Sequence, residues 1–301
     1  MKKKSFMLVL TLASKKRILF KKYNNLIAEF LNHNNISLEG IKKLAPFVKD
    51  YYFSVNDKNF INKINNIFNK KKFSEVDICV QERKYRKKKI IACDMDMTAI
   101  KEETLNIIGE KVLNNDLIKN LTTQAMSGEI KFQEAIILRT KMLQGIKKSK
   151  IVDILKDISF TPGIKSVIRT MNHNGCHTML ITGGYNLIAE YVAREIGFKE
   201  VVSNSLIFEN GIVTGKLGSE IIDRDMKLKY FQKSVIENNI KSFETLAVGD
   251  GDNDIKMIEF ASLGVAWKAY PKVRFAADIC LNNDMKNILY FQGYSKKQII
   301  N

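Results

Sequence analysis

A short apolar run that ends in two aspartates is the feature of this sequence that most restricts its fold. Lys89–Cys93 (KIIAC) is short, mainly apolar and followed at once by polar residues, which is typical of a buried strand. Asp94 and Asp96 come directly after it. In an open parallel α/β sheet, ligands bind at the carboxyl ends of the strands. An isolated aspartate after a strand is more often a turn or helix-cap residue. The pair indicates a functional site only together with the polar clusters that follow it.

Two further predicted strand ends carry polar clusters. The strand His177–Ile181 leads to Thr182-Gly183-Gly184, and the strand Thr245–Val248 leads to the sequence GDGDND. Lys227 begins a predicted helix between them. Carboxylates from two strands that meet at one sheet edge repel each other unless a cation lies between them, and hard oxygen ligands favour Mg²⁺. A hydroxyl before two glycines, together with a lysine, suits phosphate oxygens. With an aspartate as nucleophile, these groups fit phosphoryl transfer.

Strands and helices alternate in the C-terminal half of the chain, which predicts a parallel, doubly wound α/β sheet. An Asn-Gly pair suits a tight turn and predicts a hairpin of Val201–Phe208 with Ile212–Lys216. Besides the strands already named, the predicted elements are helices at Ile164–Asn174, Tyr185–Ile196, Lys227–Asn238 and Ile255–Ala261 and a strand at Gly264–Trp267. Leu289–Gly293 (LYFQG) imitates a protease-tag remnant, but we interpret it as a native tail.

The segment after Asp96 is predicted to be helical throughout, with a break at Ser127-Gly128-Glu129. An all-helical insertion directly after a sheet strand predicts a lid that closes over the strand end. The predicted helices are Glu102–Ile108, Glu110–Leu113, Leu117–Met126, Lys131–Leu143 and Lys147–Asp157.

Residues 1–80 predict a separate small α/β unit, joined to the rest by the charged segment 81–89 (QERKYRKKK) as a basic linker. The predicted division is therefore 1–80 for the N-terminal domain, 90–100 with 160–295 for the core, and 101–159 for a helical cap. The N-terminal elements are strands at Met7–Thr11, Tyr51–Val55 and Val76–Val80 and helices at Tyr23–His33 and Asn59–Asn69.

The net charge of +17 is concentrated near the N-terminus. Residues 1–90 hold 22 Lys and Arg against 7 Asp and Glu, which leaves 27 against 25 for residues 91–301. A basic segment can bind nucleic acid or another polyanion, but no aromatic-interleaved motif or finger spacing accompanies it. We favour a solvated surface and expect no nucleic-acid binding. Binding of a polyanion or a small effector by residues 1–90 stays the alternative from a different functional class.

Composition also bears on location. No run approaches the ~20 apolar residues of a membrane-spanning helix, so we expect no membrane association. Lys2–Lys4 before an apolar run imitates a signal peptide, yet no Ala-x-Ala site follows, which favours a strand and a cytoplasmic protein. The four cysteines lack metal-like spacing and predict buried, reduced thiols. The sequence leaves open whether the protein forms a homodimer.

The motifs Asp94–Thr98 (DMDMT), Thr182–Gly184 (TGG), Lys227 and Gly249–Asp254 resemble, in order and spacing, the four motifs of the haloacid dehalogenase superfamily of phosphatases. The helical insertion resembles that superfamily's first type of cap. Within the superfamily the chain is most similar to the phosphoserine phosphatases, over about residues 88–295. The resemblance implies a Rossmann-like core with a helical cap and an Mg²⁺ cofactor. It also implies hydrolysis of O-phospho-L-serine through an aspartyl-phosphate, the last step of serine biosynthesis.

The resemblance further implies a role for each motif residue. Asp94 would be the nucleophile and a magnesium ligand. Asp96 would protonate the leaving alcohol, then activate the water, and bind the metal through its carbonyl. The remaining roles are Asp250 as a metal ligand, Asp254 as an orienting group, Thr182, Gly183 and Asn253 as phosphate-binding groups, and Lys227 as a catalytic and phosphate-binding group.

For the substrate, Glu103 matches the acidic residue near the ammonium group and Arg139 the arginine that binds the carboxylate. Met126 and Phe132 match apolar residues of the cap pocket. From position alone, Glu103 would be a helix N-terminal carboxylate and Arg139 a surface charge; the resemblance favours the substrate roles. The alternative is another small phosphomonoester, for example homoserine phosphate, or transfer onto an acceptor alcohol.

Three residues depart from the family's pattern. Thr182 stands where a serine is common, and it keeps the hydroxyl. Met97 stands where a serine is usual, and Asp252 stands where alanine or serine is usual. Met97 leaves the turnover rate open, and Asp252 adds charge that leaves the metal affinity open.

Overall fold

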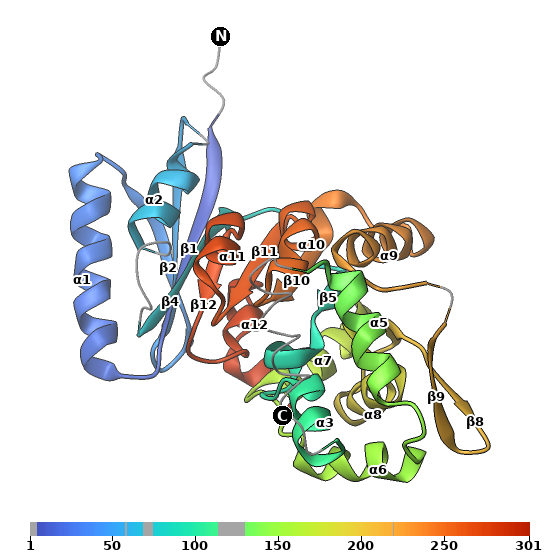
Figure 1. Ribbon diagram of the computed structural model, residues 1–301. Helices are drawn as coiled ribbons and strands as arrows, with labels where there is room; N and C mark the ends of the chain where they lie inside the picture. The colour runs from blue at the N-terminus through green and yellow to red at the C-terminus, as the bar shows by residue number, and fades with distance from the viewer. Residues whose placement is uncertain (1–4, 58, 69–74, 114–129, 219) are drawn as a thin grey trace.

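The computed structural model describes residues 5–57, 59–68, 75–113, 130–218 and 220–301. In these residues the chain forms a six-stranded sheet, a four-stranded sheet and a two-stranded hairpin. The four-stranded N-terminal sheet lies beside the six-stranded one, and the helices of the insertion gather on the opposite side of the molecule (Figure 1).

The six-stranded sheet has the order β12-β11-β10-β5-β6-β7, and every neighbouring pair in it is parallel. Taken along the chain, the strands run outward from β5 in one direction and then from β10 in the other. This confirms the predicted doubly wound sheet. Its topological switch point lies between β5 and β10, where such sheets bind ligands. The strands are β5 (Ile90–Cys93), β6 (His177–Tyr185), β7 (Glu200–Asn204), β10 (Thr245–Gly249), β11 (Leu263–Trp267) and β12 (Ile279–Leu281).

Both faces of this sheet are covered, which explains why its strands are apolar runs rather than alternating ones. In β5, Ile91 and Cys93 belong to one core cluster and Ile90 and Ala92 to the other, as the two-residue period of a strand requires. One face carries α7 (Ile164–His173), α8 (Asn186–Ile196) and α12 (Asn287–Phe291), and the other carries α9 (Arg224–Glu237), α10 (Ile255–Phe260) and α11 (Pro271–Ala276) (Figure 1).

The N-terminal sheet has the order β2-β3-β1-β4 and is antiparallel throughout, which is the split βαβ arrangement. Leu8, Leu10 and Leu12 of β1 belong to the core of this part. β2 was missed by the sequence analysis because Lys42 and Lys43 make it a charged, exposed edge strand. The elements are β1 (Phe6–Ser14), α1 (Arg17–His33), β2 (Leu38–Ala45), β3 (Val48–Val55), α2 (Phe60–Phe68) and β4 (Val76–Glu82).

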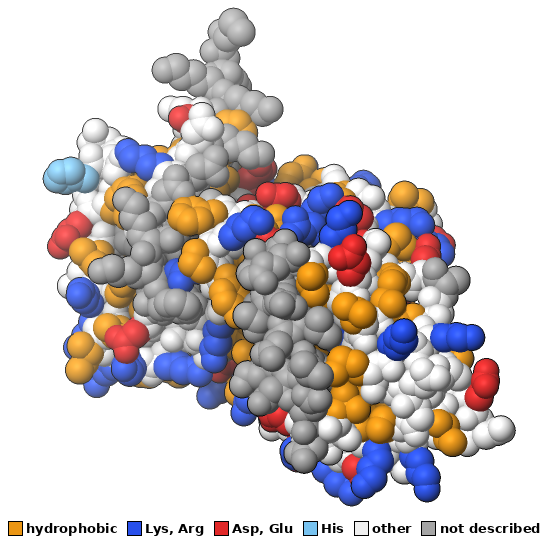
Figure 2. Space-filling view, in the orientation of Figure 1, with side chains coloured by type: hydrophobic (Ala, Val, Ile, Leu, Met, Phe, Trp, Pro, Cys, Tyr) orange, Lys and Arg blue, Asp and Glu red, His pale blue; other side chains and the backbone are white. Residues whose placement is uncertain are grey.

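Where Figure 2 shows described residues, Lys and Arg side chains are interspersed with Asp and Glu. Among the described residues, every helix is too short or too polar to span a bilayer. All four cysteines are buried and free, as predicted.

The insertion after β5 contains α3 (Thr104–Lys111), α5 (Phe132–Met142) and α6 (Lys148–Asp153), followed by a single turn at Ile154–Asp157. The predicted helix Leu117–Met126 lies outside the described residues. The two ends of the insertion meet, since Lys101 N–H donates to Ser159 O (2.9 Å) and Thr161 N–H donates to Ala99 O (3.0 Å).

The predicted hairpin is partly wrong. Its first half is β7, which pairs with β6 in the main sheet, and only β8 (Leu206–Glu209) and β9 (Ile212–Leu217) form the hairpin. Asn210 (φ 50°) and Gly211 (φ 76°) have the left-handed backbone that a type I′ turn requires.

The C-terminal segment is more ordered than predicted. α11, β12 and α12 were missed because elements of three to six residues are too short to show a period. The segment interpreted as a tail contributes the buried Leu289 and Phe291 to the core.

The charged segment 81–89 lies within an interface. Arg86 is buried and pairs with Asp50 of β3 (2.8 Å), and it donates to the carbonyls of Phe291 and Tyr290 (3.1 Å each). Burial lowers the pKa of Lys88 to about 8. Arg86 therefore links the N-terminal sheet to α12, so the segment is more than a spacer. The predicted division into domains stays a prediction.

Candidate active site

The two strands at the switch point bring the acidic groups together. Asp94 directly follows β5, Asp250 directly follows β10, and these strands are hydrogen-bonded neighbours. One carboxylate oxygen from each of Asp94, Asp250 and Asp254 lies within 4.8 Å of the others. Residues that are about 150 positions apart in the sequence thus form one cluster because of the strand order.

Lys227 is fully buried inside this cluster. Its Nζ lies 2.5 Å from Asp94 Oδ1 and 2.8 Å from Asp254 Oδ1. Burial favours the neutral amine, but the charges of Asp254 and Asp94 outweigh it and raise the pKa of Lys227. The lysine therefore stays protonated, because the two carboxylates offset the cost of burying its charge.

Asp254 serves the cluster as a bridge between chain segments. Its Oδ1 accepts from Lys227, and its Oδ2 accepts from the N–H groups of Asp250 (3.2 Å) and Gly251 (3.1 Å). A Cβ at Gly249 would lie 2.4 Å from this carboxylate, so the close approach needs a glycine. The position agrees with an orienting role.

The cluster holds more negative charge than one lysine neutralises. Burial raises the pKa of Asp94, and the charge of Asp254 adds to the rise. Burial and Asp254 also raise the pKa of Asp250 to about 7, against a hydrogen bond that Thr98 Oγ1 donates to Asp250 Oδ1 (2.9 Å). A divalent cation between the carboxylates would offset this repulsion, and the oxygen-only donor set fits a hard cation.

Asp96 lies in a wide turn, Met95–Ala99, that follows Asp94. Its Oδ1 accepts from Thr104 N–H (2.9 Å), and burial raises its pKa. A Cβ at Gly184 would lie 3.2 Å from Thr182 Oγ1 and 3.3 Å from Asp96 Oδ2. The glycine thus lets the end of β6 lie beside Asp96, and the predicted hydroxyl joins the site.

The insertion supplies the other side of the site. Phe132 Cζ lies 2.8 Å from where a Cβ of Gly183 would be, so the ring covers the end of β6. Burial raises the pKa of Glu103 to about 8, with a further contribution from Asp96 and an opposing one from Arg139. Arg139 is only 3% exposed, and its Nε has no hydrogen-bond partner among the described residues.

The remaining predicted residues differ in what the structure says of them. Asn253 lies in the short turn Asp252–Asp254 that follows β10, with its Oδ1 2.7 Å from where a Cβ of Gly251 would be. Met126 lies outside the described residues. Asp252 does not add unpaired charge, since it contacts Arg224 and forms an ion pair with Lys272 (2.6 Å).

Sequence reasoning missed Asn204, a fully buried residue at the end of β7. Its Nδ2 donates to Gly183 O (2.7 Å) and its Oδ1 accepts from Ile222 N–H (2.8 Å). The amide thereby holds Gly183, near the end of β6, to the segment that contains Ile222. No signal pointed to it, because the sequence placed Asn204 inside a predicted hairpin strand.

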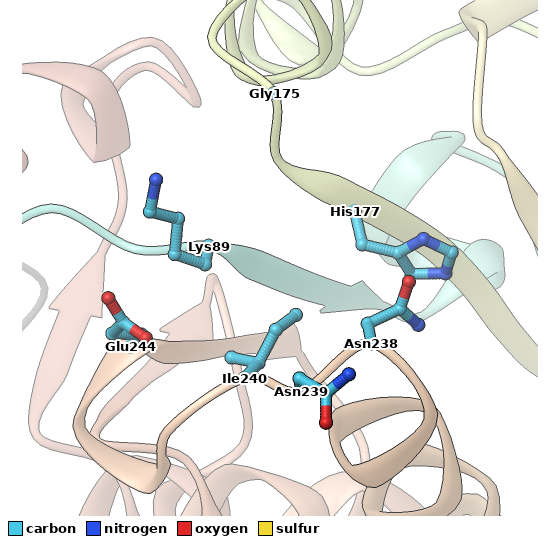
Figure 3. Close-up of a pocket in the computed structure, with 7 residues that line it drawn as sticks. All are labelled: Lys89, Gly175, His177, Asn238, Asn239, Ile240 and Glu244. Carbon is cyan, nitrogen blue, oxygen red and sulfur yellow. The ribbon is translucent and has the colours of Figure 1, made fainter.

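A separate surface pocket lies at the opposite, amino end of the sheet (Figure 3). Lys89, which precedes β5, and His177, which begins β6, both line it. None of the predicted site residues does. The other lining residues are Gly175, Asn238, Asn239, Ile240 and Glu244.

Comparison with known proteins agrees with this geometry. A family model described as haloacid dehalogenase-like hydrolase matches residues 91–259. A phosphoserine phosphatase of Lactococcus lactis subsp. lactis is 36% identical over 202 residues, which cover 67% of this chain and 93% of the relative. A solved structure of a phospho-aspartyl intermediate analogue of phosphoserine phosphatase is 29% identical, with a TM-score of 0.63, over 68% of this chain and 99% of that one.

A further solved structure extends the likeness to the N-terminal sheet. A hydrolase from Salmonella enterica subsp. enterica serovar Typhi has a TM-score of 0.80 over 94% of this chain and 98% of that one. Its sequence identity is 22%, so it shares the fold alone.

Proposed function

The chain belongs to the haloacid dehalogenase-like hydrolase family, and we propose that it hydrolyses O-phospho-L-serine to L-serine and phosphate. The observation that carries the proposal is the buried contact of Lys227 with both Asp94 and Asp254 at the switch point of the sheet. The similarity to a phosphoserine phosphatase at 36% identity supports the substrate. Glu103 and Arg139, an acidic and a basic residue that interact electrostatically, suit a substrate with an ammonium and a carboxylate.

In the first step, Asp94 attacks phosphorus. A bond forms between its carboxylate oxygen and phosphorus as the bond from phosphorus to the serine oxygen breaks. Asp96 gives a proton to the leaving serine oxygen, and the burial that raises its pKa favours the protonated form that an acid needs. In the second step, water attacks phosphorus, Asp96 takes the proton from the water, and phosphate leaves as Asp94 is restored.

Mg²⁺ fits the acidic cluster, with Asp94, Asp250 and the carbonyl of Asp96 as its protein ligands. Asp254 is less suited as a ligand because both its oxygens already accept hydrogen bonds. When bound, the cation would neutralise charge on the phosphoryl oxygens. The phosphate would contact Lys227, Thr182, Gly183 and Asn253, and the apolar side of the pocket would come from Phe132 and Met126.

The wider assignments are also proposals. We propose that 101–159 is a cap over a core made of 90–100 and 160–295, and that the reaction completes serine biosynthesis in the cytoplasm. Four buried free thiols suit a reducing compartment. Residues 1–80 are proposed as a unit that binds a small effector, which calorimetry of the full chain with L-serine tests.

The first experiment measures phosphate release from L-phosphoserine with Mg²⁺. The parent chain should be active, and Asp94→Asn should lose at least about a thousandfold in kcat because the nucleophile is gone. Asp153→Asn removes an exposed carboxylate of α6 and should leave the rate unchanged. Substantial activity in Asp94→Asn would show that the covalent mechanism is wrong.

The second experiment tests the substrate. Arg139→Ala should lower kcat/KM for L-phosphoserine by about 100-fold but for p-nitrophenyl phosphate by no more than about threefold, because only the first has a carboxylate to bind. Arg194→Ala, which removes an exposed arginine of α8, is the control. Homoserine phosphate is assayed alongside these two substrates. A higher kcat/KM of the parent chain for homoserine phosphate than for L-phosphoserine would favour the alternative substrate.

A further inference from the structure

Two hydroxyl groups join the inserted helix α5 to the end of β6. Thr140 Oγ1 and Tyr185 OH lie 2.9 Å apart, and both residues are fully buried. Tyr185 directly follows Gly184, and Thr140 directly follows Arg139. The contact therefore links the segment proposed to hold the phosphate with the residue proposed to hold the carboxylate.

The direction of this hydrogen bond follows from the number of protons. Thr140 Oγ1 donates its single proton to Ile136 O (2.7 Å) one turn earlier in α5. Tyr185 must therefore be the donor to Thr140 Oγ1. Burial raises the pKa of Tyr185 to about 12, which keeps the phenol protonated. Tyr185→Phe thus removes the donor and Thr140→Val removes the acceptor.

The position of Arg139 depends on how α5 is held. Its Nε has no hydrogen-bond partner among the described residues, so none of those residues anchors the guanidinium through that atom. Burial lowers the pKa of Arg139, and the carboxylate of Glu103 opposes this shift. Phe132, seven positions earlier on the same face of α5, lies against Gly183. A shift of the helix would thus change the distance from Arg139 to the end of β6.

We propose that the hydrogen bond from Tyr185 to Thr140 is a positioning pair that selects the substrate by the distance between its carboxylate and its phosphate. The inference rests on the proposed function. Serine phosphate has one methylene fewer between these groups than homoserine phosphate. A helix held at a fixed distance from the end of β6 favours the shorter molecule, and a helix released from Tyr185 accepts both.

The test compares kcat/KM for L-phosphoserine, homoserine phosphate and phosphoethanolamine, which lacks the carboxylate. In Tyr185→Phe and Thr140→Val, the value for L-phosphoserine should fall about 5- to 20-fold, mainly through KM, as expected for one buried hydrogen bond. The value for phosphoethanolamine should stay within about twofold, and the preference for phosphoserine over homoserine phosphate should decrease. The double variant should be no worse than either single variant, because the two groups act as one unit.

Two further variants separate positioning from stability. Thr140→Ser keeps the hydroxyl and should retain the parent's preference for phosphoserine over homoserine phosphate. Tyr51→Phe removes another buried phenol, in β3 of the N-terminal sheet, whose OH donates to Asn24 Oδ1 of α1 (2.6 Å). It should lower Tm and leave all three substrate ratios unchanged.

The outcomes are distinguishable from those of the proposed function. An equal loss on all three substrates in Tyr185→Phe, or unchanged ratios, would overturn the positioning role while phosphoserine turnover by the parent stands. A parent chain that does not hydrolyse L-phosphoserine would overturn the proposed function, and this inference with it.

Discussion

Met97 shows how backbone geometry between the two aspartates constrains a single residue. Its φ of 55° and ψ of −2° lie in the left-handed region, and its side chain is 48% exposed. Its N–H donates to Glu102 O (3.1 Å), and the turn that carries Asp96 is closed by Ala99 N–H, which donates to Asp94 O (3.2 Å). A methionine pays about 1 kcal/mol for this conformation and gains little from burial. The turn, rather than the side chain, is what this position provides.

Met97→Asn should therefore raise the free energy of unfolding by about 0.5–1 kcal/mol, because asparagine tolerates the left-handed region better. Urea unfolding measures this. Met7→Asn, at a 55% exposed methionine in the extended strand β1, should give no gain. Equal losses in both variants would contradict the explanation. Met97→Ser tests the side chain separately: a higher kcat would show that the methionine slows turnover.

At the scale of single residues, the site residues that belong to local motifs could be predicted from the sequence. Their tertiary partners could not. Asp94 and Asp250 were predictable because each directly follows an apolar strand. The partners of Asp252 were not, since Arg224 and Lys272 come from other elements. The added charge that seemed to threaten metal affinity is therefore already paired.

Among the elements, α9 shows how a helix start positions the buried Lys227 of the candidate site. Asp223 Oδ1 accepts from the N–H groups of Asp225 and Met226 (3.0 Å each), which caps the helix. Lys227 lies one turn later, so the cap fixes the backbone from which the buried amine extends. The sequence analysis began this helix at Lys227 because the polar first turn shows no apolar period.

Asp223→Ala should destabilise the chain by about 1 kcal/mol and lower kcat several-fold, because the first turn of α9 frays and Lys227 loses its fixed position. Asp223→Ser keeps a capping oxygen and should recover most of both losses. Asp223 also accepts from Gln133 Nε2 (2.7 Å), so Gln133→Ala isolates that contact. A kcat loss in Gln133→Ala equal to that in Asp223→Ala would show that the cap is not responsible.

Long elements were predictable from their periodicity and apolar content, and short ones were not. α8 and α5 agree with the predicted helices within one residue at each end. The strand predicted across Val201–Phe208 is two strands in different sheets, since the chain leaves the edge of the main sheet at Ser205. The cluster Ser203-Asn204-Ser205 marks the exchange, but the sequence analysis read the strand straight through it.

At the scale of the whole molecule, the two sheets are joined by buried polar groups. Asp77 of β4 is fully buried and accepts from Asn282 N–H (3.0 Å), Asn283 Nδ2 (2.9 Å) and Asn287 Nδ2 (2.7 Å). Burial nevertheless raises its pKa from 3.8 to about 6. The folded chain thus holds this proton to a higher pH than the unfolded chain does.

Between pH 4 and 6 the folded state binds more protons than the unfolded state, so the contribution of Asp77 to stability falls as pH rises through this window. The shift corresponds to on the order of 3 kcal/mol. Asp77→Asn cannot ionise, so the free energy of unfolding of the parent minus that of the variant should decrease by up to this amount between pH 4 and 7. Urea unfolding at several pH values measures it, and a constant difference would contradict the assignment.

The parallel sheet was predictable because alternating strands and helices permit few other arrangements. The relation between the sheets was not. The charge of segment 81–89 predicts that it is exposed to solvent. Arg86 is instead buried against Asp50 and against carbonyls of α12. Only the tertiary partners of a cation decide whether it lies in water or in an interface.

The closure of the insertion at its base has a consequence for evolution and engineering. Ala99 and Thr161 are hydrogen-bonded across the gap, and so are Lys101 and Ser159. A short turn could thus bridge the core chain there, and the length of whatever is inserted places almost no demand on the sheet. The sheet can therefore tolerate exchanged or redesigned helices at this position, provided that Glu102 and Thr104 are kept, because they contact Met97 and Asp96.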